Sequence, residues 1–205
     1  MAAGAAEQNE SETAIRAVRD VGPDPVALDL EAPPGFDAAP GRFVRLATTV
    51  DGDRVERFYT VSSPRVDATF EVTVGVDPEG TLGPALADAS PGTAVEIEGP
   101  FGETAYRGAG PALALAAGPG VGAALAVAER AVGDGEPAGL VLRGDGAVHA
   151  VRLDGLRRDA GFVSVAESHL DRRVAAAVDA LDGDGEFRGG AYVYGFSSFV
   201  EDALV

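Results

Sequence analysis

The feature that most constrains the fold is a change of pattern near residue 108. Before it, short apolar or alternating segments are separated by turn signals, among them Asp51-Gly52, a frequent hairpin turn. After it, the chain is rich in Ala and alternates strand-like with helix-like segments. Many short strands predict a closed barrel or sandwich, and alternating strands and helices predict a parallel sheet. We therefore expect a loose tail over residues 1–11, a β-barrel domain over 12–107 and a small α/β domain over 108–205.

The strands expected in the first domain are Thr13–Arg19, Val26–Ala32, Arg42–Thr49, Arg54–Ser62, Thr69–Val76, Ala94–Glu98 and Glu103–Arg107. Thr81–Ala89 breaks this pattern and predicts a short helix, because Leu82 and Leu86 lie four residues apart on one face. In the second domain we expect strands over residues 112–117, 139–143, 161–166 and 191–195, and helices over 123–132, 171–181 and 197–204. Asp171 is the expected N-cap of its helix, and residues 144–151 also allow a hairpin.

The composition excludes several kinds of site. The chain has no Cys, which rules out disulfides, thiolate metal sites and Cys-ligated iron–sulfur clusters. We expect no metal site, because the acidic, Gly-containing loop over residues 182–186 lacks the calcium-binding pattern. His149 and His169 occur in unrelated contexts that are typical of surface residues. Neither a membrane-spanning apolar run nor a basic-then-apolar leader is present, so we expect a cytoplasmic protein.

The charge is strongly negative. The formal net charge is −17, and Arg supplies all 16 basic residues. Such a surface repels nucleic acid. Acidity can simply aid solubility, or it can be an adaptation to molar salt, where the Debye length falls to about 3 Å and self-repulsion is screened. The absence of Lys with an excess of Asp and Glu favours an extreme halophile, since a GC-rich genome replaces Lys with Arg but adds no acids.

A candidate cofactor site lies in the segment Arg57–Pro64. In an extended strand Arg57 and Tyr59 share one face, which places a fixed cation beside an aromatic ring. A guanidinium binds phosphate oxygens in pairs, and a Tyr ring packs on a flat heteroaromatic partner. These residues are compatible with a phosphorylated aromatic cofactor, and equally with an ordinary half-buried strand that carries an exposed Arg.

The order Arg57-x-Tyr59-Thr60, followed by a Ser-rich turn and Pro64, resembles the flavin-binding motif of the ferredoxin–NADP⁺ reductase family. The resemblance implies a Greek-key FAD-binding barrel followed by a nucleotide-binding domain. It assigns Arg57 to the flavin pyrophosphate, Tyr59 to the isoalloxazine and Thr60 to the reactive N5 of the flavin. We name Tyr59 and Thr60 as the candidate catalytic residues.

Later segments resemble the same family in the same order. Gly80-Thr81-Leu82-Gly83 lies where the family receives the flavin phosphates through Gly-x-x-[Ser/Thr], although the last position here has no hydroxyl. We expect Gly80 and Thr81 near the phosphates, and Val74 and Gly75, at the end of the preceding strand, beside the flavin. Gly99-Pro100-Phe101-Gly102 resembles the turn at the family's barrel exit.

A strand, a Gly-rich turn and a helix form a cradle for a pyrophosphate, or else only a tight turn. Gly118-Pro119-Gly120-Val121-Gly122 resembles the family's nicotinamide-nucleotide loop, typically Gly-Thr-Gly-Ile-Ala-Pro, with Gly118 and Gly120 retained. Tyr194-Gly195-Phe196 replaces the family's Cys-Gly-Pro and keeps only Gly195. Arg143 and Asp145 follow the next strand and leave NADH and NADPH open, because Arg suits a 2′-phosphate and Asp a free ribose.

The resemblance implies an FAD-dependent oxidoreductase that passes electrons between NADH or NADPH and an acceptor protein such as ferredoxin. The flavin carries the chemistry, and the protein positions it. The altered Gly118–Gly122 loop and the changed turn at Gly195 leave an alternative, a non-enzymatic flavoprotein that transfers electrons or regulates a partner. A barrel that binds no flavin and acts as a scaffold is a further alternative.

Overall fold

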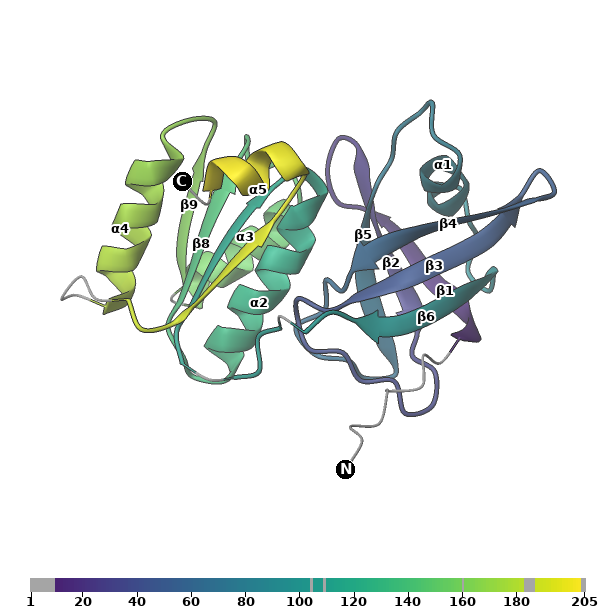
Figure 1. Cartoon of the computed structure of the whole chain (residues 1–205), viewed down its shortest axis with the longest axis horizontal. Helices are drawn as coiled ribbons and strands as arrows, with labels where there is room; N and C mark the ends of the chain where they lie inside the picture. Colours follow the sequence, from purple (N-terminus) through teal and green to yellow (C-terminus); the bar gives the residue numbers. More distant parts are fainter. Residues whose placement is uncertain (1–9, 104, 109, 160, 183–186, 204–205) are drawn as a thin grey trace.

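The computed structural model describes residues 10–103, 105–108, 110–159, 161–182 and 187–203. Two β-sheets form two neighbouring units, and helix α2 lies between them (Figure 1). The first sheet is six-stranded, antiparallel and curled; we call it the barrel. The second is four-stranded and parallel; we call it, with its helices, the α/β unit. The expected combination of a barrel and a parallel sheet is confirmed.

The barrel strands are β1 (Glu10–Asp20), β2 (Pro25–Glu31), β3 (Phe43–Val50), β4 (Asp53–Thr60), β5 (Thr69–Gly75) and β6 (Ala94–Phe101). Their order in the sheet is β4-β3-β6-β1-β2-β5. The two edge strands meet where Val61 and Val72 form an isolated antiparallel bridge and the Ser62 N–H donates to the Glu71 carbonyl over 2.7 Å. This contact closes the sheet on itself beside the end of β4.

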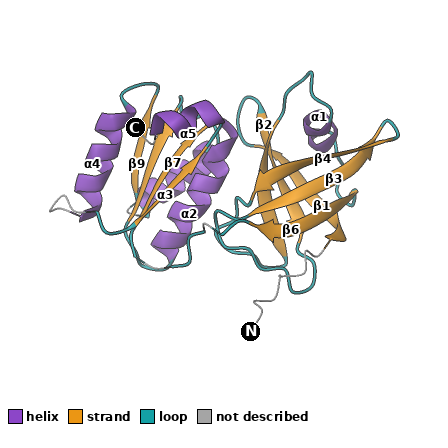
Figure 2. Ribbon diagram, viewed as in Figure 1, coloured by secondary structure: helices purple, strands orange, loops and turns teal. Residues whose placement is uncertain are grey.

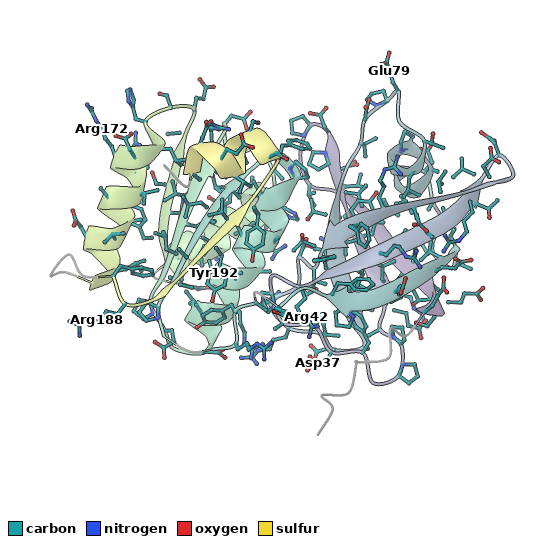
Figure 3. The ribbon with its side chains drawn as sticks, in the orientation of Figure 1. Asp37, Arg42, Glu79, Arg172, Arg188 and Tyr192 are labelled. Carbon is teal, nitrogen blue, oxygen red and sulfur yellow. The ribbon has the colours of Figure 1, made fainter. Side chains whose placement is uncertain are left out.

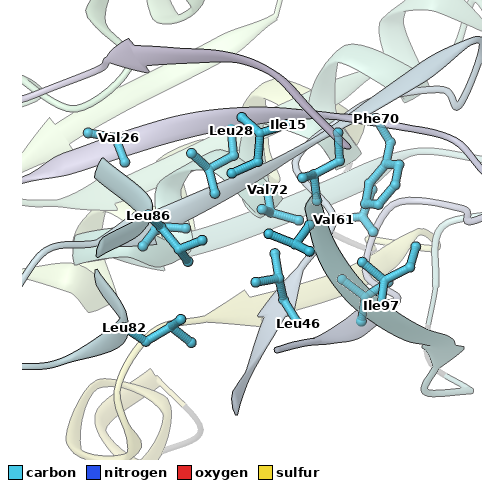
Figure 4. Close-up of a cluster of buried hydrophobic side chains, with 14 of the residues drawn as sticks. Ile15, Val26, Leu28, Leu46, Val61, Phe70, Val72, Leu82, Leu86 and Ile97 are labelled. Atoms are coloured by element: carbon cyan, nitrogen blue, oxygen red, sulfur yellow. The ribbon is translucent and has the colours of Figure 1, made fainter. Parts of the chain in front are cut away.

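Apolar side chains from all sides of the barrel meet inside it (Figure 4). Helix α1 (Leu82–Ala87) covers one end of this core, because Leu82 and Leu86 are both buried in it. The helix predicted from the four-residue spacing of the two leucines is thus confirmed. Its packing holds the segment Gly80–Thr81 at the edge of the barrel next to the end of β4.

The α/β unit contains β7 (Ala112–Ala117), the 3₁₀ turn η1 (Gly118–Gly120), α2 (Val121–Gly133), β8 (Ala138–Arg143), α3 (Ala150–Arg158), β9 (Phe162–Ala166), α4 (Leu170–Asp182), β10 (Gly190–Tyr194) and α5 (Ser197–Ala203). The strand order is β10-β7-β8-β9. Helices cover both faces of this sheet (Figure 2). Ala114 and Ala116 face the α2 side, whereas Leu113 and Leu115 face α4 and α5, so the continuous apolar run of β7 is buried on both faces.

Tyr106 connects the two units. Its backbone N–H donates to the Pro40 carbonyl on the barrel side over 2.9 Å, while its ring is buried in the core of the α/β unit and meets Tyr192 edge to face. Its hydroxyl donates to the Gly110 carbonyl over 3.0 Å. This residue therefore ties the connecting segment to both sides.

Four local expectations are wrong. The hairpin over residues 144–151 is a turn followed by α3, and Asp171 lies inside the first turn of α4 rather than at its cap. No strand forms at Glu103 or over residues 105–107, where Gly102 has a left-handed backbone with φ of 88° and the chain turns away from β6. The tail expected over residues 1–11 is too long, because Glu10 and Ser11 form the start of β1 and pair with β6. Residues 1–9 and most of the acidic loop, residues 183–186, lie outside the described residues. Among the described residues, no helix is long and apolar enough to cross a membrane.

Candidate cofactor cleft between the barrel and the alpha/beta unit

A cleft of about 1110 Å³ opens where the barrel meets the α/β unit. Its walls come from the end of β4, the end of β5, the start of α1, the turn after β7 and the turn after β10. Nine of the ten residues that the sequence proposes for cofactor binding or catalysis line it: Arg57, Tyr59, Thr60, Gly75, Gly80, Thr81, Gly118, Gly120 and Gly195. The tenth, Val74, does not: its side chain is buried in the barrel core, because it alternates with Gly75 along β5.

The end of β4 presents a cation and a phenol to this cleft. The Arg57 side chain is exposed and donates to the Glu56 carbonyl over 2.7 Å, and it has no carboxylate partner among the described residues. Tyr59 packs against the barrel core, and this burial raises the pKa of its hydroxyl, an effect that the Arg57 charge opposes. The hydroxyl therefore stays protonated and able to donate a hydrogen bond. Phe58 points to the other face of the strand and meets Phe43 edge to face.

The segment before α1 is shaped by close backbone contacts. A Cβ on Gly83 would lie 3.0 Å from the Gly75 carbonyl oxygen, which is tighter than nine in ten real contacts. A hydroxyl residue at this position, as in the reductase family, would therefore require the backbone at Gly75 to shift by a few tenths of an ångström. Thr81 stands at the N-cap of α1 but makes no side-chain capping bond. Its hydroxyl is thus not used within the helix, and it lies at the wall of the cleft.

The turn after β7 and the start of α2 pack closely against the end of β10 on one side and against the barrel on the other. Gly118 has φ of 57°, and a Cβ on Gly120 would lie 2.6 Å from the carbonyl of Tyr194. Gly120 is therefore required by packing against the end of β10. A Cβ on Gly122 would lie 2.7 Å from Ser62 Oγ and 2.9 Å from Thr73 Cβ, so glycine is also what lets α2 approach the barrel this closely. The family's Ala is excluded here for a steric reason.

Two aromatic rings flank the mouth of the cleft on the α/β side. Tyr194 lines the cleft, and burial raises the pKa of its hydroxyl well above the ordinary value. Phe196 is 69% exposed and lies next to the Gly118 turn. The Phe196 ring is therefore largely open to solvent at the edge of the cleft that it lines.

Acidic residues outnumber basic ones among the residues that line the cleft. The charged residues that line it are Arg57 and three carboxylates, Asp24, Asp77 and Asp145. Arg143, at the end of β8, is engaged elsewhere: it pairs with Asp202 over 2.8 Å and lies over the Phe199 ring. Asp145 accepts the Ala147 N–H through one oxygen over 2.9 Å. Arg143, which the sequence analysis offered for a 2′-phosphate, is thus paired with Asp202, whereas Asp145 lines the cleft.

The sequence analysis missed a buried polar cluster behind the cleft. His149, expected at the surface, is only 4% exposed and contacts Thr73, which in turn contacts Ser62. No local signal indicated that His149 is buried, because Thr73 and His149 lie 76 residues apart in the chain. In addition, the segment Val148–Val151 has an alternating pattern typical of a strand, although His149 directly precedes helix α3. His169, by contrast, is exposed as expected.

Residues 19–106 match the family model of the oxidoreductase FAD-binding domain. The sequence matches no curated protein. Among solved structures, the chain is similar to the ferredoxin NADP⁺ reductase from Neisseria gonorrhoeae with bound FAD and NADP, with a TM-score of 0.75, 14% identity, and coverage of 97% of this chain and 90% of that one. It is also similar to the ferredoxin reductase in carbazole 1,9a-dioxygenase, with a TM-score of 0.77, 21% identity, and coverage of 98% of this chain and 65% of that one.

A third similar structure is the cytochrome b5 reductase domain of Ulva prolifera nitrate reductase, with a TM-score of 0.68, 14% identity, and coverage of 95% of this chain and 90% of that one. Similarities at this level of identity establish the shared fold, and the family model establishes the nature of the barrel. The chain thus has the ferredoxin–NADP⁺ reductase-like fold, and its barrel is an oxidoreductase FAD-binding domain.

Proposed function

We propose that this protein is an FAD-dependent oxidoreductase that passes electrons between a nicotinamide dinucleotide and an acceptor protein such as ferredoxin. The observation that carries the proposal is the cleft itself. It brings the flavin-motif residues Arg57, Tyr59 and Thr60 from the barrel to the same cavity as Gly118 and Gly195 from the α/β unit. Both halves of a hydride-transfer site therefore face one space.

The residues present fit FAD. The cleft is of the size that holds large ligands, and Arg57 offers a guanidinium that no carboxylate of the described chain neutralises. We assign Arg57 to the pyrophosphate, where a planar fork binds two oxygens. The Tyr59 ring packs on the flavin ring system, Thr60 donates a hydrogen bond to its polar edge, and Thr81 with Gly80 receives phosphate oxygens. FAD, when bound, supplies the capacity to accept a hydride and release electrons singly.

The second half of the site is assigned to a nicotinamide dinucleotide. Gly118 and Gly120 hold a turn between a buried strand and a helix, which is a suitable geometry for a pyrophosphate. The ferredoxin NADP⁺ reductase from Neisseria gonorrhoeae, which shares the fold, was solved with both FAD and NADP. We favour NADH over NADPH here, because Arg143 is paired with Asp202 and Asp145 borders the cleft.

A second candidate function is a flavoprotein without nicotinamide activity. It is favoured by Tyr194 and Phe196, whose bulky side chains line the cleft on the α/β side next to the Gly118 turn. In this alternative the rings stack on the flavin permanently and the chain transfers electrons between other partners. The two candidates share FAD and differ only in whether NADH or NADPH reduces it.

Titration with FAD tests the shared part. Arg57→Ala should weaken FAD binding about ten- to a hundredfold, because a charge-assisted hydrogen bond contributes about 1.5–3 kcal/mol. Arg172→Ala is the matched control: it removes the same charge from an exposed position on α4, on the far side of the molecule (Figure 3). Equal FAD affinity in the wild-type and Arg57→Ala proteins would show that the flavin does not bind as assigned.

A further inference from the structure

A chain of three buried polar groups crosses from the barrel to the α/β unit. Ser62 Oγ lies 2.8 Å from Thr73 Oγ1, which lies 2.9 Å from His149 Nε2. All three residues are less than a tenth exposed. Thr73 also lines the cofactor cleft, so a residue of the cleft wall is held by a histidine from the other unit.

The backbone conformation of His149 is unfavourable for a residue other than glycine. Its backbone is left-handed, with φ of 55°, which costs roughly 1 kcal/mol or more in a residue other than glycine. Its N–H donates to the Val21 carbonyl in the turn between β1 and β2 over 2.6 Å, a second contact with the barrel. Burial, assisted by the charges of Arg152 and Arg19, lowers the pKa of His149 to about 3. The ring is therefore neutral and forms a directional hydrogen bond with Thr73.

One turn further along α3, Arg152 adds a second set of contacts. Its guanidinium donates to Glu71 Oε1 over 2.7 Å and to the Ser62 carbonyl over 2.8 Å, both on the barrel. The same guanidinium binds Glu129 of α2 over 2.7 Å. The start of α3 thus holds the barrel through both a neutral hydrogen-bond chain and partly buried ion pairs, next to the close approach at Gly122.

We propose that His149 is a positioning residue that acts through Thr73 to hold the barrel and the α/β unit at the spacing required for hydride transfer in the cleft. The proposal rests on the proposed function. The flavin residues belong to one unit and the nucleotide turn to the other, so only the interface between them sets the distance between the reacting groups. Hydride transfer needs reacting atoms about 3–3.5 Å apart, and a displacement of about 1 Å costs roughly a hundredfold in rate.

The test replaces His149 with Asn, which tolerates the left-handed backbone but is too short to reach Thr73. His169→Asn is the matched control, because His169 is the other histidine with a left-handed backbone, at φ of 60°, and it is exposed. Thr73→Val removes the hydroxyl from the other side of the bond at nearly constant volume. It keeps the test valid should His149→Asn fold poorly.

The first measurement does not depend on activity. The chain has no Cys, so Glu79→Cys and Arg172→Cys place one spin label on each unit at exposed positions (Figure 3). Electron–electron double resonance then reports the distance distribution between the two labels. The parent and His169→Asn proteins should show the same narrow distribution, whereas His149→Asn and Thr73→Val should broaden or displace it. An unchanged distribution in both variants overturns the proposal.

The second measurement is the rate at which saturating NADH reduces the bound flavin. His149→Asn should lower this rate by about a hundredfold, with FAD affinity kept within about threefold of the parent. A changed distance distribution with an unchanged rate overturns the positioning role. If neither NADH nor NADPH reduces the flavin of the parent protein, the proposed function is refuted instead. The distance distribution then still decides whether His149 fixes the two units.

Discussion

Gly122→Ala tests whether α2 and the barrel approach as closely as the structure shows. The added methyl group would lie 2.7 Å from Ser62 Oγ and 2.9 Å from Thr73 Cβ, and closer still to Thr73 Oγ1. Rotating the two hydroxyls away relieves only part of this overlap. The contact with Thr73 Cβ still has to lengthen from 2.9 Å to the ordinary minimum of 3.4 Å, so α2 must retreat from β5 by 0.5 Å.

The cost follows from the groups that move. Turning Thr73 away breaks its hydrogen bonds to Ser62 and His149, and each buried polar group left unpaired costs about 1–3 kcal/mol. Overpacking adds a cost of similar size. Even the lower ends of these costs add up, so we expect Gly122→Ala to lower the free energy of unfolding by about 3 kcal/mol or more, which lowers the melting temperature of a chain of this length by at least roughly 6–12 °C.

The assay is urea unfolding in molar KCl, with Gly133→Ala as the control. Gly133 ends the same helix, and a Cβ there meets nothing within 4 Å. This control should be neutral or stabilising by up to about 1 kcal/mol, because Ala is the better helix former. Equal stability of Gly122→Ala and Gly133→Ala would refute the close approach of α2 and β5.

Two further predictions concern the solution conditions. Because the net charge is −17, we expect the chain to need roughly molar salt to fold, since screening relieves the repulsion between carboxylates. Circular dichroism across a salt series measures this, and a chain equally folded in dilute buffer would contradict a halophilic origin. His149 has a folded-state pKa of about 3, below the 6.5 of a free histidine, so the unfolded state binds more protons between these values and stability must rise with pH across that window and level off above it. Urea unfolding at several pH values measures how steeply the free energy of unfolding rises with pH. This slope should be smaller in His149→Asn than in the wild type by up to about 1.4 kcal/mol per pH unit. An identical slope in the two proteins would exclude a buried neutral histidine.

Local pattern predicted much of the fold. Alternation along β4 correctly separates Tyr59, which packs on the barrel core, from Phe58, which lies on the outer face. The continuous apolar run of β7 correctly predicts a strand covered on both faces, and the spacing of Leu82 and Leu86 correctly predicts α1. In each case the side-chain period itself records which face is buried.

What the sequence concealed depends on contacts between distant segments. Helix α3 was missed because it follows a left-handed His149 without a capping side chain, and because Gly155 and several charged residues weaken its pattern. The steric need for Gly122 is set by Thr73 and Ser62, which lie far away in the chain. The burial of Val74, by contrast, was readable from the sequence, because Phe70, Val72 and Val74 alternate along β5 and all lie in the core; its placement at the cofactor overlooked this alternation.

The most direct test of the central claim is anaerobic stopped-flow absorbance of the FAD-loaded protein mixed with excess NADH, and separately with NADPH. The claim is that one cleft holds both a flavin and a nicotinamide dinucleotide. It predicts bleaching of the flavin band that is faster with NADH than with NADPH, slow in the wild type, and accelerated in Tyr194→Ala or Phe196→Ala, which clear the mouth of the cleft. No bleaching by either nucleotide, in the wild type or in both variants, would contradict the claim and leave the non-enzymatic flavoprotein as the better interpretation.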